Sequence, residues 1–308
     1  MTPRTATLLA VAGGSLLAMQ SRVNGTLAGD LGSPLPAAAV SFAVGALATG
    51  AAVLASGALR PALAAVHAHR PPPWQWCGGL GGATLVGASA YAVPLIGVAF
   101  LTVCTVAGQT AGGLVVDRAG FGPSGRHRIT GARAAGATLA VVALLLAAAG
   151  HGGRARPGLF ALLAVAGATV ALQQAANGRL STATGQPVFA SFVSFVGGTV
   201  ALVAVCLGQA ISGHLGSLQW PDPGHGWLYL GGLGGAAYIT MSTLAVRVLG
   251  VLRLSLASIA GQLLAGVLLD VVAPTGDGLQ PLTVVAVVLT VGAVSLAGRT
   301  PRRAGLPA

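Results

Sequence analysis

The residues best able to do chemistry in this 308-residue chain are amides and hydroxyls set within long apolar runs. Gln20 and Asn24 are four residues apart, so on a helix they share one face. The same pair recurs at Gln173 and Asn177. An amide offers both a hydrogen-bond donor and an acceptor, and polar groups in a bilayer are costly unless they meet partners or water. These four side chains are therefore the first candidates for contact with a polar solute.

Two further polar pairs extend this candidate set. The full set of predicted substrate-binding residues is Gln20, Asn24, Ser41, Gln109, Gln173, Asn177, Ser194 and Gln262. The same residue types also cross-link helices within membranes, at roughly 0.6 kcal/mol per contact. Both interpretations stay open for the glutamines, whereas the serines favour packing and the asparagines are near enough to predicted helix ends to act as C-caps.

The chain offers little material for other chemistry. Cys77, Cys104 and Cys206 are widely spaced and form no metal-binding or disulfide pattern. We find no HExxH or GxSxG motif and no paired acids within an apolar run, so an intramembrane enzyme is not expected. The glycine run from Gly78 to Gly82 lacks the preceding strand of a nucleotide site and favours close helix packing. We expect no catalytic residue, no cofactor and no metal ion.

The composition indicates that lipid, not water, is the main solvent. Hydrophobic residues make up 54% of the chain and charged residues only 7%, against roughly 25% in an average soluble domain. The mean hydropathy is +0.83. The formal charge of +11 comes entirely from arginines that lie in the gaps between apolar runs. That placement favours orientation in a membrane, so nucleic acid is not an expected partner.

Ten apolar runs are long enough to cross a bilayer, which needs about 20 residues per helix. Breakers such as Gly32-Ser33-Pro34 and charged residues separate them. The segment from Gly57 to Pro73 has room for a short interfacial helix. The predicted fold is an all-α integral membrane protein whose ten spans lie near residues 5–27, 35–56, 74–95, 98–117, 129–149, 158–180, 187–210, 227–246, 250–270 and 280–298.

The chain matches itself when it is shifted by 153 residues. From Gly14 to Gly45, 13 of 32 positions are identical, and the shift places Gln20 on Gln173. Asp117 falls on Asp270 in the same register. We therefore predict two five-helix repeats, residues 1–150 and 154–303. Because five is odd, the second repeat enters the membrane from the opposite side, which makes the repeats inverted.

The arginines fit this inverted arrangement. With both termini in the cytoplasm, all sixteen basic residues lie on the inner side except Arg22, Arg154 and Arg156. Arg22 is expected either to reach the outer interface or to face the cavity. Asp117 and Asp270 are expected at helix ends.

The repeated motif gives a family resemblance. A first helix ending in Gln20-Ser21-Arg22-Val23-Asn24-Gly25, followed by Gly32-Ser33-Pro34 and Ser41-Phe42, resembles the YdcZ-like branch of the drug/metabolite transporter superfamily. The resemblance covers essentially the whole chain. It implies an exporter in the bacterial inner membrane without naming a substrate.

The predicted function is secondary transport of a small solute by alternating access between the two repeats. A non-transporting scaffold or accessory subunit is the main alternative, and a channel also stays open. The expected partners are a small-molecule substrate and the lipid bilayer, with a homodimer as an open alternative to a monomer.

Overall fold

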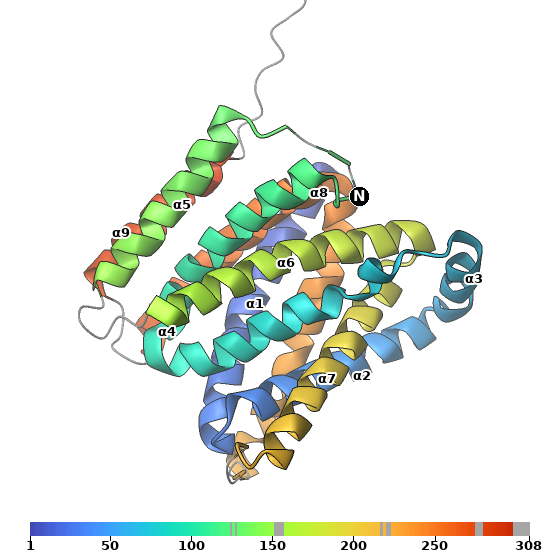
Figure 1. Ribbon diagram of the computed structural model, residues 1–308, viewed down its shortest axis with the longest axis horizontal. Coiled ribbons are helices and arrows are strands. Elements are labelled where there is room, and N and C mark those ends of the chain that lie inside the picture. The colour runs from blue at the N-terminus through green and yellow to red at the C-terminus, as the bar shows by residue number, and fades with distance from the viewer. Residues whose placement is uncertain are drawn as a thin grey trace, which may run out of the picture.

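The computed structural model describes residues 1–123, 125–126, 128–150, 157–215, 218–219, 223–274 and 280–297, and every regular element in these ranges is helical. Figure 1 shows the long helices crossing one another in a single bundle. In chain order they are α1 (Pro3–Leu31), α2 (Pro34–Ala55), α3 (Leu59–His69), η1 (Pro73–Trp76), α4 (Gly78–Ala119), α5 (Gly131–Gly150), α6 (Pro157–Thr184), α7 (Pro187–Ile211), η3 (Pro223–Leu230), α8 (Gly231–Val272) and α9 (Pro281–Ala297).

Helix α4 is broken at Gly97, whose backbone has φ 73° and ψ 171°. Only glycine adopts this conformation readily. Pro94 lies three residues earlier and weakens the same turn of helix. In Figure 1 α4 turns sharply near its label, and its two arms run in different directions within the bundle. The break therefore allows one helical segment to supply two of the predicted apolar runs, 74–95 and 98–117.

Seven helical segments in the described ranges are long and apolar enough to cross a membrane. One of them, Pro73–Ala119, has 47 residues and as a straight helix would reach about 70 Å, roughly twice the thickness of a bilayer core. Two shorter apolar helices, Gly131–Leu146 and Pro281–Ala293, lie in α5 and α9. The all-helical membrane fold is confirmed, and the count of ten crossings stays a prediction. The segment predicted to hold a short helix forms α3.

The two halves of the chain interlock through repeat-related glycines. A Cβ atom added to Gly108 on α4 would lie 1.7 Å from the carbonyl oxygen of Ala164 on α6. With the halves exchanged, a Cβ on Gly261 of α8 would lie 1.9 Å from the carbonyl oxygen of Val11 on α1. Side chains at these glycines would force the helices apart, so their absence allows backbones to touch.

The glycine runs pack as the sequence predicted. Gly79 meets the backbone oxygen of Ser194 on α7, and Gly232 meets that of Ser41 on α2. The first and second helices of each half are therefore covered by the third apolar run of the other half.

Two phenylalanines fill the contact between α2 and α7. Phe42 and Phe195 are both 1% exposed, and their ring centroids lie 5.1 Å apart. Gly45 and Gly198 make room for them, since each would place a Cβ within 2.3 Å of the other half's ring. The helices α5 and α9 lie side by side at one edge of the molecule (Figure 1).

Candidate functional site

The predicted amide and serine residues gather into two repeat-related clusters. On α6, Gln173 Nε2 and Asn177 Nδ2 each donate to Ser194 Oγ on α7, both at 3.3 Å. In the first half, Gln20 Nε2 donates to Ser41 Oγ at 3.1 Å. These bonds join the first helix of each half to the second. The serines thus hold amides in place, as the packing interpretation expects.

The remaining predicted residues are also buried. Asn24 is 0% exposed, and within the described ranges neither polar atom of its side chain has a hydrogen-bond partner. The same holds for Gln109, and Gln262 Nε2 also lacks a partner there. An unpaired buried amide is costly, so these groups are available for hydrogen bonds with a polar partner.

The C-cap interpretation of the asparagines is wrong. Helix α1 continues to Leu31, and helix α6 continues to Thr184. Asn24 and Asn177 consequently lie inside helices, and Gly32 forms the C-cap of α1 in the left-handed conformation. Apolar periodicity ended the predicted spans too early because the last turns of both helices carry polar residues.

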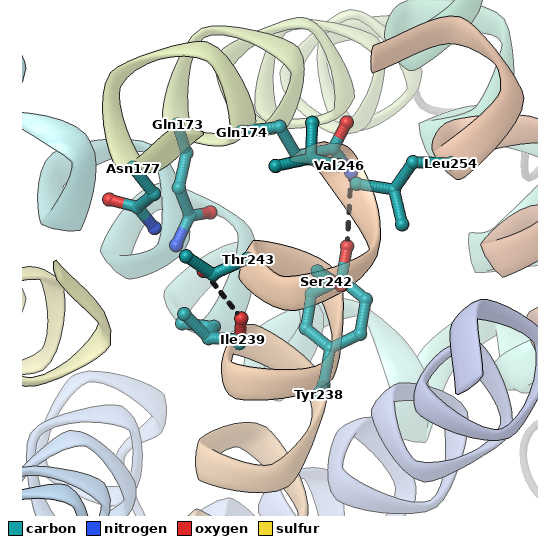
Figure 2. Close-up of a pocket in the computed structure, with 9 residues that line it drawn as sticks. All are labelled: Gln173, Gln174, Asn177, Tyr238, Ile239, Ser242, Thr243, Val246 and Leu254. Carbon is teal, nitrogen blue, oxygen red and sulfur yellow. Dashed lines mark hydrogen bonds between the residues drawn. The ribbon is translucent and has the colours of Figure 1, made fainter. Parts of the chain in front are cut away.

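A small cavity lies between α6 and α8, and six of its nine lining residues are polar, although most of the surface that faces the cavity is apolar (Figure 2). Its volume, as the space open to the centre of a water-sized sphere, is about 10 Å³, enough for about one water molecule. The lining residues are Gln173, Gln174, Asn177, Tyr238, Ile239, Ser242, Thr243, Val246 and Leu254. Gln173 and Asn177 are the two predicted site residues that reach it.

A hydrogen-bond chain that the sequence analysis missed crosses beside this cavity. Ser255 Oγ donates to Gln174 Oε1 at 2.8 Å, and Gln174 Nε2 donates to the hydroxyl oxygen of Tyr238 at 3.3 Å. All three residues are at most 5% exposed. The chain links α6 to both apolar runs of α8.

The repeat itself contains a signal that finds one of these residues. Gln174, Tyr238 and Ser255 correspond to Ser21, Leu85 and Thr102 in the first half. A search for residues kept in both halves passes over them. A search for polar residues gained in one half selects Tyr238 alone, because Ser21 and Thr102 are already polar.

A larger cavity of about 420 Å³ lies between α2, α4, α6 and α7. It shares no residue with the small cavity between α6 and α8, which we call the amide cavity. It is lined mainly by apolar side chains, including Leu35, Leu80, Leu162 and Leu202. Most of the surface that faces this cavity is apolar, as it also is in the amide cavity, and none of the predicted site residues lines it. Size alone therefore does not select the site.

Asp270, near the end of α8, fastens the break in α4. Its carboxylate accepts hydrogen bonds from the backbone N–H groups of Val98 at 3.1 Å and Ala99 at 2.7 Å. These N–H groups open the second arm of α4, where the helix dipole favours an anion. The guanidinium of Arg22 lies 3.7 Å from the carboxylate and donates to the backbone oxygen of Ala273. We call Asp270, Arg22 and these two N–H groups the Asp270 clasp.

The clasp explains Arg22 better than either sequence-based expectation. Its side chain is 15% exposed and ends in an ion pair between helices. Asp270 lies at a helix end as predicted, but it caps a different helix. Its repeat counterpart Asp117 pairs with Arg133 at the start of α5.

The chain belongs to the family described as "Putative inner membrane exporter, YdcZ", whose model matches residues 5–146 and again residues 158–296. The two matches coincide with the two halves of the internal repeat. A solved structure described only as "Crystal structure of protein" has 24% sequence identity and a TM-score of 0.59. That likeness covers 96% of this chain and 98% of the other, and it concerns the fold alone. No curated protein matches the chain.

Membership gives the class of protein. The chain is an inner-membrane protein of a transport family, in contact with the lipid bilayer, and the resemblance of the Gln20 to Gly25 motif to this family is confirmed. Families of this kind act by moving solutes and not by covalent catalysis.

Proposed function

We propose that the protein is a secondary transporter that exports a small solute by alternating access between two inverted repeats. The observation that carries this proposal is the cavity between α6 and α8, which amide and hydroxyl residues line and which is buried among membrane-length helices. Polar side chains are costly at such depth in a membrane. Buried amides and hydroxyls there are more typical of a solute pathway than of a packing contact.

The reciprocal packing of the halves supports inverted repeats. Contacts such as Gly108 with Ala164 recur as Gly261 with Val11, so each half holds the other in the same way. With five spans per half, both termini lie in the cytoplasm and the arginine-rich loops face inward. Residues 1–150 and 154–303 then rock against each other around their shared helices.

In this orientation the two ends of the pathway are closed by different contacts. The Asp270 clasp lies at the outer face, where α8 ends and the second arm of α4 begins. The amide cavity lies past the middle of α6, toward the cytoplasm. We infer that the structure represents a closed state, in which the clasp seals the outside while the cavity holds only about one water.

Counterflow in reconstituted vesicles tests transport directly. Liposomes that contain the purified protein are loaded with an unlabelled metabolite library, and labelled members of the library are added outside. A carrier gives saturable uptake that is accelerated by internal solute. Uptake without saturation or acceleration indicates a channel, and no uptake above protein-free liposomes supports a scaffold; either result overturns the proposal.

Cysteine labelling tests the orientation separately. Ala64 lies in α3, and residue Gly276 lies outside the described residues. In a cysteine-free background, a cysteine at position 64 should react only with an impermeant maleimide on the cytoplasmic side, and one at 276 only with reagent outside. Labelling of both from one side contradicts the inverted topology.

A further inference from the structure

Resting on the proposed function, we propose that the transported solute is uncharged and bears both a hydrogen-bond donor and an acceptor. Small amides and polyols have this chemistry. Tyr238 is the residue that sets the preference, and Gln174 positions its hydroxyl.

The cavity offers no countercharge to an ion. Its described polar lining consists of amides, aliphatic hydroxyls and the phenol of Tyr238. Arg179 on α6 instead donates to the backbone oxygens of Gly120 and Phe121, at 2.9 and 3.1 Å. Asp270 is held by the clasp near the far end of α8. An unpaired ion in such a site loses its hydration without an opposite charge, at a cost of several kcal/mol.

The hydrogen bonds are arranged to serve a solute with both polarities. Gln173 and Asn177 commit their amide nitrogens to Ser194, and Figure 2 shows these nitrogens turned toward one another. The carbonyl oxygen of Gln173 is the acceptor that these bonds leave for a solute donor, whereas that of Asn177 faces Gly78 on α4. The Tyr238 hydroxyl accepts from Gln174, so its own proton is the donor at the other side of the cavity.

The difference between the repeats is an independent observation. The amides at positions 20, 24 and 109 are matched by amides in the second half, so the polar framework is kept. At the cavity, Leu85 of the first half is replaced by Tyr238, and Ser21 by Gln174. The Tyr238 hydroxyl is a polar gain in one half only, which is what substrate selection requires, because the other copy packs with the apolar Leu85 at this position.

A matched panel in proteoliposomes tests the class of solute. The panel pairs lactamide and other small uncharged amides and polyols with carboxylate and ammonium analogues of the same size, and each is assayed for counterflow against protein-free liposomes. We expect saturable counterflow of uncharged members only, unchanged when a potassium gradient with valinomycin imposes a membrane potential. Counterflow of the charged members, or flux that follows the potential, overturns this inference while transport stands. No flux of any solute overturns both proposals.

A Tyr238→Phe variant tests the residue. Phenylalanine keeps the ring and removes the donor, so the KM for the carried solute should rise about three- to tenfold, the effect of one neutral hydrogen bond. The control is Tyr229→Phe in η3, a tyrosine away from the cavity, which should leave KM unchanged. An unchanged KM in Tyr238→Phe with folded protein removes this residue from solute recognition.

Discussion

Replacing Asp270 by asparagine should open the face of the protein that the clasp closes. The carboxylate accepts two charge-assisted hydrogen bonds and faces Arg22, whereas an amide keeps one acceptor and turns its NH2 toward a backbone donor. Hydrogen bonds to charged groups contribute about 1.5–3 kcal/mol each, and a neutral one about 1 kcal/mol. The net loss is about 3 kcal/mol, or about 150-fold in the equilibrium for opening. The Arg22 side chain is 15% exposed, so it recovers some hydration when the carboxylate is removed. The lower bound for the change in the opening equilibrium is therefore about tenfold.

Labelling of a buried cysteine measures this opening. Val98 is 0% exposed and lies directly under the clasp, so a Val98→Cys variant lacking native cysteines reports it. When reclosing is faster than labelling, the rate follows the open population. Reaction with an external impermeant maleimide should therefore accelerate between tenfold and 150-fold in Asp270→Asn.

Two controls separate the clasp from general loosening. Asp30, whose carboxylate bonds exposed His225 at 2.8 Å, gives Asp30→Asn as a matched variant that should leave the rate unchanged. A separate variant that keeps Cys104 as its one cysteine reports global opening, because this residue is 0% exposed and lies deeper on α4. A rate at Val98→Cys within about threefold of the parent, or a parallel rise at Cys104, refutes the reasoning.

Two further predictions concern the amides and the interlocked glycines. The double variant Gln20→Ala with Gln173→Ala should lower solute flux while the protein stays folded in detergent, since each amide bonds one serine; unchanged flux removes the pair from the pathway. Gly108→Ala should lower the thermal stability sharply, because its Cβ would lie 1.7 Å from the backbone oxygen of Ala164. Gly29→Ala, with nothing within 4 Å of its Cβ, should be neutral or slightly stabilising, and equal melting temperatures for the two glycine variants would contradict the packing.

The sequence predicted the elements well because lipid imposes a simple rule on them. Apolar runs of about 20 residues mark spans, and a shift of 153 residues marks the repeat. Even the role of the glycine runs followed, since small residues at regular spacing have one main use between membrane helices. The sequence identified Gln173 and Ser194 as candidate site residues. It did not show that they bond to each other, because helix register decides which polar groups meet.

The missed features depend on contacts between distant segments. Arg22 and Asp270 are far apart in the chain, and only the break at Gly97 brings two backbone N–H groups to the same carboxylate. Tyr238 was missed for a different reason. Matching the halves emphasised what they share, which includes Gln173 and Asn177 of the cavity lining, whereas Tyr238 stands where the first half has an apolar leucine.

Reciprocal access is the most direct test of alternation. Single cysteines at Val98 and Thr243 probe opposite ends of the proposed pathway, since Thr243 lines the amide cavity. In Asp270→Asn, labelling of position 98 from outside should rise while labelling of position 243 from the cytoplasmic side falls. If both positions become more reactive together, or if position 243 does not respond, the two halves do not exchange access and the carrier mechanism is contradicted.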